Sequence, residues 1–319
     1  MARLVAAALA ALGFAGTAAA HAPSAIVVDT DGTIYFSDGS RGIWRLAEGK
    51  ASLIDPHPVH WMALDVEGRF PAAGRKIAKH FERVALLGSN SVLITCGGSP
   101  VALGRGGTIY YAPDMNVARV SPGSEEKILV PRKALGAGNH PWGITGMSSG
   151  PERAVYVFAT DSFNVNEATG AHAIFKVTED GKMTAHARDF VKSQIPESDR
   201  PPQVKSTYCR GLAVDDDGGV YVAATGSRSV IHVPREGRPR IVLEAAKPWS
   251  PTGVAVRKGE VFVLEHDEET PVPHGEWPPR VRKVDHDGKV STLYPLERGE
   301  AKVPDAAKKA PERSGRSPR

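Results

Sequence analysis

Short apolar runs, rather than long amphipathic periods, mark the chain between residues 24 and 294. One such run recurs five times, and each copy combines Val or Ile with Tyr or Phe. β-Branched and aromatic residues in runs of this length favour β-strands. The five copies lie at residues 32–38, 107–112, 154–159, 219–223 and 260–264.

Each copy belongs to a larger unit of four predicted strands. A short first strand precedes the copy, a third strand follows where a basic residue stands before an aliphatic one, and a turn leads into a fourth strand. The third-strand signature occurs six times, so the unit occurs six times as well. The first strands begin at Ser24, His60, Ser99, Trp142, Arg210 and Thr252.

This repeat predicts an all-β fold, a six-bladed β-propeller with four antiparallel strands per blade. Both faces of each blade are apolar, so no copy can bury its hydrophobic surface without neighbours. The six copies must therefore close into one domain, which we place at residues 21–296. The second copy is the least regular, because its second strand would be only residues 69–70, ahead of Pro71. No strand is evident that would pass between the chain ends to close the ring.

The amino-terminal end does not share the repeat. Arg3, the apolar run after it and three alanines at 18–20 are typical of a secretory signal peptide, here residues 1–20. We therefore expect a periplasmic or secreted protein, and no later stretch is apolar enough to span a membrane. Cleavage would leave His21 first, where its amine and imidazole could together chelate copper.

The formal charge of +4 is concentrated at the two ends. Between residues 21 and 296 the chain holds 32 basic and 32 acidic residues. A neutral body lacks the cationic field that holds phosphate backbones, so nucleic-acid binding is not expected. Residues 297–319 are basic and have no hydrophobic period, which predicts a disordered, solvated tail. The alternative is a tether to an anionic surface.

Two strings, residues 26–38 and 209–221, resemble NHL-repeat and gluconolactonase-like six-bladed propellers, the senescence-marker-protein superfamily. The resemblance covers residues 24–294 and implies the propeller fold, with functions that range from lactone hydrolysis to plain binding. In the gluconolactonase class it further implies a divalent cation at the channel mouth on Glu, Asp and Asn side chains, which polarises the lactone carbonyl. None of the six first-strand openings is a carboxylate, so this chain departs from that pattern.

Loop length distinguishes the two faces of the predicted ring. Connections between first and second strands are tight turns, such as residues 29–32 and 215–218. The opposite connections hold the insertions, and function concentrates on loops displayed by a rigid scaffold. We therefore expect the working site on the insertion-bearing face, over the central channel. The predicted insertions are residues 71–80, 161–172, 189–208 and 265–279.

The residues that open the first strands should surround the channel mouth on that face. Trp142 could stack on a ligand or pack between blades, and Arg210 could pair with an anionic ligand or form a structural ion pair. The predicted ligand-binding residues are His60, Ser99, Trp142, Arg210 and Thr252.

Histidines could alternatively hold a metal at the same mouth. His60 and His140 resemble two zinc ligands of the related propeller lyase that completes peptide amidation, and His266 stands on the long connection of blade six. Three neutral imidazoles would suit zinc and leave one position for water, although the sequence requires no cofactor, and carboxylates on this face could hold calcium instead. Glu265 and Asp161 are the candidate acid–base residues.

Cys96 and Cys209 would be expected to pair in an oxidising compartment. They enter blades three and five, which are not adjacent, and a disulfide requires Cα atoms within about 7 Å. A disulfide and two free thiols therefore both stay open.

Two functions follow from these residues. The first is an exported propeller that recognises a small molecule or a protein partner on its loop-rich face without chemistry. The second is a metal-dependent lactone or ester hydrolase or lyase, in which zinc or calcium is the Lewis acid. The sequence does not specify the oligomeric state.

Overall fold

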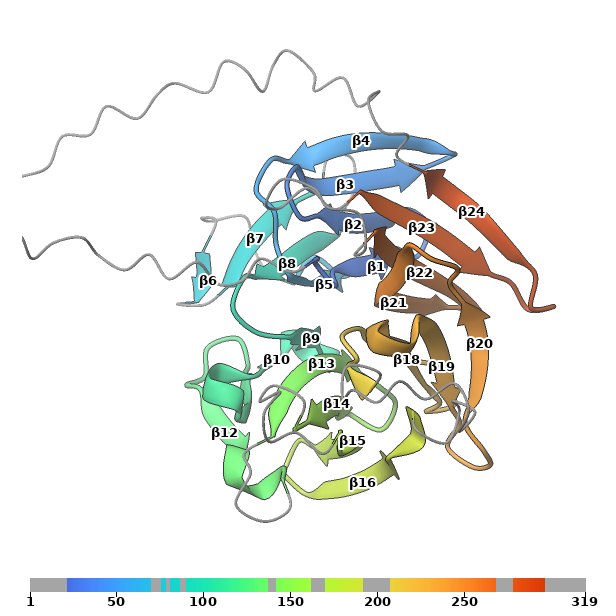
Figure 1. Cartoon of the computed structure of the whole chain (residues 1–319). Coiled ribbons are helices and arrows are strands. Elements are labelled where there is room, and N and C mark those ends of the chain that lie inside the picture. Colours follow the sequence, from blue (N-terminus) through green and yellow to red (C-terminus); the bar gives the residue numbers. More distant parts are fainter. Residues whose placement is uncertain are drawn as a thin grey trace, which may run out of the picture.

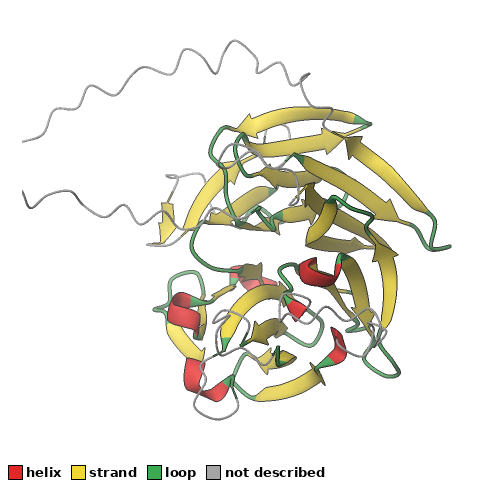
Figure 2. Cartoon of the chain, in the orientation of Figure 1, coloured by secondary structure: helices red, strands yellow, loops and turns green. Residues whose placement is uncertain are grey.

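Six four-stranded antiparallel sheets stand in a ring around a central axis (Figure 1). The structure is a computed structural model that describes residues 22–69, 76–78, 81–86, 90–136, 142–161, 170–191, 207–267 and 278–295. Strands dominate the described chain, with loops and short helical turns between them (Figure 2). The predicted all-β, six-bladed propeller is confirmed.

The blades follow one another in sequence. Blade one contains β1 (Ile26–Val28), β2 (Ile34–Asp38), β3 (Gly42–Ala47) and β4 (Lys50–Asp55). Blade two contains β5 (Trp61–Asp65), β6 (Lys76–Ala78), β7 (Phe81–Ala85) and β8 (Val92–Cys96). Blade three contains β9 (Val101–Leu103), β10 (Ile109–Tyr111), β11 (Val117–Val120) and β12 (Lys127–Val130).

The second half of the chain forms the other three blades. Blade four contains β13 (Gly143–Ser149), β14 (Ala154–Thr160), β15 (His172–Thr178) and β16 (Met183–Arg188). Blade five contains β17 (Leu212–Val214), β18 (Val220–Ala224), β19 (Ser229–Val233) and β20 (Arg240–Glu244). Blade six contains β21 (Trp249–Arg257), β22 (Glu260–Asp267), β23 (Pro279–Val284) and β24 (Val290–Pro295). Short 3-10 helices are η1 (Arg105–Gly107), η2 (Pro113–Met115), η3 (Arg132–Ala134) and η6 (Thr225–Ser227).

Blade two differs from the sequence prediction in the order of its strands. Its sheet runs β5-β8-β7-β6, whereas the other five sheets follow chain order. The predicted second strand at residues 69–70 is therefore wrong, because β8 pairs with β5 and occupies that position. The predicted insertion at 71–80 is wrong as well, since its middle residues form the outer strand β6. Arg69 instead binds the buried carboxylate of Asp65, with its Nε 3.0 Å from Oδ1, as the chain turns out of β5.

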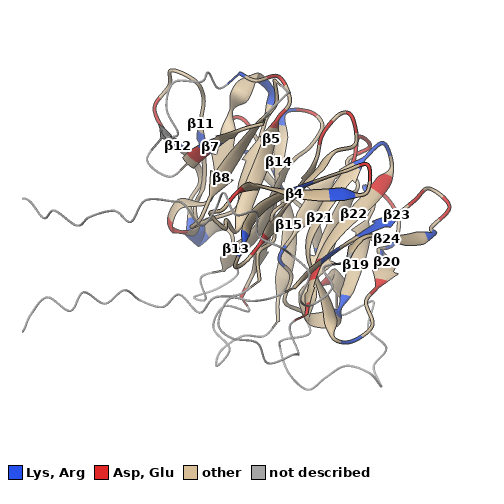
Figure 3. Cartoon of the chain, turned by 90° about the horizontal axis from the view of Figure 1, so that it is seen from above, with Lys and Arg blue, Asp and Glu red and all other residues tan. Residues whose placement is uncertain are grey.

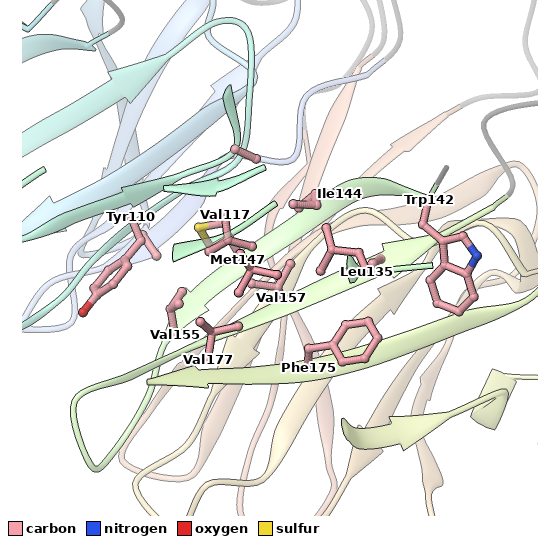
Figure 4. Close-up of a cluster of buried hydrophobic side chains, with 14 of the residues drawn as sticks. Tyr110, Val117, Leu135, Trp142, Ile144, Met147, Val155, Val157, Phe175 and Val177 are labelled. Atoms are coloured by element: carbon pink, nitrogen blue, oxygen red, sulfur yellow. The ribbon is translucent and has the colours of Figure 1, made fainter. Parts of the chain in front are cut away.

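A separate hydrophobic cluster fills each of the six junctions between adjacent blades. Figure 4 shows the junction of blades three and four, where Tyr110 and Val117 face Ile144, Val155 and Phe175. Full burial of one such large side chain stabilises the fold by about 1.5–3 kcal/mol. The packing explains why both faces of every strand run are apolar.

The ring closes by side-chain packing between blades six and one. Phe36 and Trp44 from blade one share a cluster with Phe262 and Leu264 from blade six. Tyr294, on the outermost strand β24, lies 5.2 Å from Phe36 between ring centroids. No strand is exchanged between the first and last sheets in the described chain, so this cluster joins the two ends of the ring.

A central channel of about 260 Å³ is lined by three successive residues from each inner strand. Side chains of these strands point sideways: Ile26 packs into the junction with blade six, and Ala25 and Val27 pack into the junction with blade two. Each inner strand also pairs with a neighbour on one side only. The channel wall is therefore formed largely by main-chain edges, which are polar.

The remaining predicted insertions begin and end on the face where the inner strands start. Thr160 pairs with His172 across one of them, and His266 pairs with Pro279 across another. The third joins the ends of β16 and β17 on the same face. The interiors of these insertions lie outside the described residues. We call this face the loop-bearing face and the opposite one the turn-bearing face.

Charged residues of both signs are intermixed over the described strands and turns (Figure 3), as the balanced charge of the body predicts. Among the described residues, no helix has the length and apolar character needed to cross a membrane. Cys96 and Cys209 are both buried free thiols that lie in different blade junctions. The residues assigned to the leader, 1–20, and to the tail, 297–319, lie outside the described part, so these two predictions stay open.

Candidate functional site at the channel mouth

The loop-bearing mouth of the channel is defined by the residues two positions before each channel-lining triplet. We call this set the mouth residues. They are Ser24, His60, Ser99, Thr145, Arg210 and Thr252. Five of the six predicted openings are in this set.

Blade four is the exception, because Thr145 takes the place predicted for Trp142. A β-bulge between Ile144 and Gly146 shifts the register of β13 and displaces the start of the strand. Trp142 is 4% exposed and packs 6.4 Å from Phe175, between ring centroids, in the blade three–four cluster (Figure 4). The sequence left two roles open for Trp142, stacking on a ligand and packing between blades. The structure shows it packed between blades.

Glycines let the inner strands approach one another closely at this mouth. Thr145, Arg210 and Thr252 are each followed by a glycine. A Cβ on Gly211 would come within 2.6 Å of the Gly253 Cα, and one on Gly146 within 2.9 Å of the Arg210 carbonyl oxygen. These distances are too short for real contacts. Blades four, five and six therefore need a glycine at this position, and this shared pattern is the sequence signal that identifies Thr145.

Arg210 is the buried cation of the mouth, at 3% exposure. Its Nη1 donates to the carbonyl oxygen of Ala22 at 2.6 Å, and its Nε donates to the Tyr208 hydroxyl at 3.1 Å. The guanidinium also lies 5.4 Å above the Tyr208 ring. Neither partner was predicted, and for Ala22 the reason is that a main-chain acceptor 188 residues away leaves no trace in the sequence.

Two histidines at the mouth are neutral imidazoles. Complete burial, and secondarily the nearby charge of Arg210, lowers the pKa of His266 from 6.5 to about 3. Burial and then Arg210 lower the pKa of His60 in the same direction. Arg210 thus raises the electrostatic potential that both rings experience, which disfavours a second positive charge.

His266 has one ring nitrogen engaged and one available. Its Nδ1 lies 3.0 Å from the Thr252 hydroxyl, while its Nε2 is buried without a hydrogen-bond partner in the described part of the structure. The Thr145 hydroxyl is likewise buried without a hydrogen-bond partner in the described part of the structure. Unsatisfied buried polar atoms cost about 1–3 kcal/mol each, so both atoms mark places where an added ligand or water would be stabilised.

The predicted acids occupy the ends of second strands on the same face. Glu265 is fully buried and accepts from Arg280 at 2.6 Å and from the Arg282 Nε at 2.8 Å, both on β23. A second bond from Arg282 reaches its other carboxylate oxygen. Two guanidinium groups therefore hold Glu265 in a structural contact with β23. Asp161 is 8% exposed at the end of β14, and its main-chain N–H donates to Ala171.

Asp38 is an acid that the sequence did not single out. Its Oδ1 accepts from the main-chain N–H and hydroxyl of Ser40, both at 3.0 Å, and from the Arg41 N–H at 3.3 Å. Burial raises the pKa of Asp38 despite these donors. The carboxylate caps the β2–β3 turn, and this use explains its burial.

The donor set among the described residues does not fit a divalent cation. No three His, Cys, Asp or Glu side chains come together in the ranges that the structure describes. His60 and His266 share their surroundings with the Arg210 guanidinium, whose charge repels a metal ion. His140, another of the predicted zinc ligands, lies outside the described residues. The predicted metal site is therefore not tested as a whole.

The predicted residue Ser99 has a local partner, and so does Trp249, which the sequence analysis did not name. Ser99 is half-buried, with its hydroxyl 3.7 Å from the Cys96 sulfur. Trp249 supports the guanidinium of Arg280 at 4.3 Å from its ring centre, and so belongs to the cluster around Glu265.

Comparisons with known proteins agree with this fold. No family model matches the chain. No curated protein matches it either. Solved structures that it resembles include a streptogramin B lyase, at 13% identity over 88% of this chain and 85% of that one, with a TM-score of 0.48. A gluconolactonase from Xanthomonas campestris follows at 13% identity over 86% and 77%, with a TM-score of 0.44.

A third structure is a catalytically inactive virginiamycin B lyase from Staphylococcus aureus with quinupristin, at 10% identity over 89% and 87%, with a TM-score of 0.38. The predicted likeness to gluconolactonase-like six-bladed propellers is confirmed as a likeness of fold. Similarity at this level of identity does not indicate which ligand this protein binds or which reaction it catalyses.

Proposed function

We propose that this protein is an exported recognition propeller that binds a small polar ligand at the loop-bearing mouth of its channel. The observation that carries the proposal is the Nε2 atom of His266, which is fully buried and has no partner among the described residues. A ligand hydrogen bond at this atom would relieve a desolvation cost that the folded chain otherwise bears.

The electrostatics of the mouth favour a ligand that is rich in oxygen. Arg210 supplies the positive potential, and the neutral imidazole of His266 can give or accept one hydrogen bond at Nε2. A carbonyl or carboxylate oxygen matches a guanidinium donor. Sugar acids, lactones and small carboxylic acids combine these features.

A ligand screen on the chain without residues 1–20 tests this proposal. The panel would contain sugar acids, lactones and small carboxylates, with binding detected by thermal shift and measured by calorimetry. His266→Gln should weaken the best ligand about tenfold, which corresponds to one lost hydrogen bond of about 1.4 kcal/mol. His57→Gln is the matched control, because His57 is exposed and pairs with Asp55. Equal affinity in the His266 variant and the native chain would refute the assignment.

The second candidate is a metal-dependent lactone or ester hydrolase or lyase. It needs a ligand set that includes His140, with Asp161 rather than Glu265 as the acid–base residue, since Glu265 is held by Arg280 and Arg282. Metal analysis after dialysis, followed by zinc and calcium titration, tests it directly. A protein that binds neither ion would end this candidate and leave the binding function in place.

A further inference from the structure

The chain's own amino-terminal segment, residues 22–24, lies at the channel mouth. Ala22 is 1% exposed and Ser24 is 8% exposed. The Ser24 N–H donates to the His60 carbonyl at 3.2 Å, so the segment lies beside another mouth residue. Residues 22–24 therefore enter the ring through the mouth rather than along its outer surface.

The contact of this segment with Arg210 has the form of a bound ligand. The Ala22 carbonyl oxygen accepts from the Arg210 Nη1 at 2.6 Å, and both residues are buried. A charged donor on an oxygen acceptor is among the stronger hydrogen bonds in proteins. The acceptor is a main-chain carbonyl, so a carbonyl oxygen is a group that the mouth can bind.

An external ligand at the mouth and residues 22–24 would contact the same guanidinium group of Arg210. Ala22 lies against the one buried cation among the mouth residues. Pro23 restricts the segment before it reaches β1, which reduces the entropy lost when the segment is held in place.

We propose that the mouth recognises the carbonyl oxygen of an amide or a carboxylate through Arg210, and that residues 22–24 are its resident occupant, in competition with an external ligand. This inference rests on the proposed binding function and names both the group recognised and the competitor.

The test compares three chains for binding of two probes. The chains begin at His21, begin at Ser24, or begin at His21 and carry Pro23→Gly. The probes are N-acetyl-alanyl-proline amide, which reproduces the Ala22 carbonyl, and acetate, which offers a carboxylate. Binding is followed by NMR titration, and thermal unfolding establishes that each chain is folded.

The chain that begins at Ser24 should bind at least one probe about tenfold more tightly than the chain that begins at His21. Pro23→Gly, which keeps the full length, should tighten binding about threefold because the released segment gains freedom. Arg210→Lys in the shortened chain should remove the gain. Preference for the amide would identify a peptide-like ligand, and preference for acetate would identify a free acid.

Equal probe affinity in all three folded chains would overturn the competition, as would the absence of binding to the shortened chain. Failure here is separable from failure of the proposed function. If a panel ligand binds through His266 with an affinity that does not depend on residues 21–23, the binding function stands and the resident-occupant inference falls.

Discussion

Protonation of His266 should make the protein sensitive to mild acid. The folded state holds this imidazole neutral, with its pKa lowered to about 3, whereas the unfolded chain would protonate it near 6.5. Because the folded pKa is the lower one, the stabilisation is complete above pH 6.5 and is lost progressively as the pH falls toward 3. At pH 5.0 the unfolded state lies about 1.5 pH units below its pKa, so the loss for this group is about 2 kcal/mol.

Urea unfolding followed by tryptophan fluorescence at pH 7.5 and pH 5.0 measures this loss. Between these two pH values, the free energy of unfolding of the native chain should fall by about 2 kcal/mol more than that of a His266→Gln chain. His57→Gln is the matched control, because it removes an exposed imidazole and leaves the buried His266 in place. Burial also lowers the pKa of His60, His186 and His232, so both chains will lose further stability in acid, and the comparison between them isolates His266. Identical pH dependence in the native and His266→Gln chains would refute the burial of a neutral imidazole.

Other substitutions test the packing of the ring and the site. Gly253→Ala should cost about 1–3 kcal/mol, since its Cβ would overlap the Ser24 carbonyl oxygen, whereas Gly98→Ala meets nothing within 4 Å and should be near neutral in thermal unfolding. Glu265→Gln should destabilise the fold by about 3–5 kcal/mol by leaving two partly buried guanidinium groups without their carboxylate, and an unchanged urea midpoint would contradict that role. Tyr294→Ala should cost about 3 kcal/mol at the blade six–one junction, and a value near zero would show that the cluster does not hold the ring closed.

The sequence predicted the blades well because each blade leaves a local pattern. Alternating and continuous apolar runs mark strands whose two faces both lie in junctions, so the number of repeats equals the number of sheets. The order of strands inside a sheet leaves no such pattern. The run at β8 reads like any buried strand, and only the pairing with β5 shows that it belongs to blade two.

The mouth was predictable to the extent that it follows the strand register. Counting back from each inner strand identifies five mouth residues, and the bulge in β13 is the reason that the sixth was assigned to Trp142. The contact of Arg210 with Ala22 could not be predicted. It depends on where the first described residues lie relative to blade five, and it is distant in sequence and made by a main-chain atom.

The junction between the first and last blades has a consequence for biogenesis. Every sheet is built from a contiguous piece of chain, so each can form as soon as its own residues have left the ribosome. The apolar side of blade one, including Phe36 and Trp44, stays exposed to solvent until β24 has been synthesised and has packed against it. During that interval the nascent protein carries an unprotected hydrophobic wall, and this is the stage at which chaperones would be needed most.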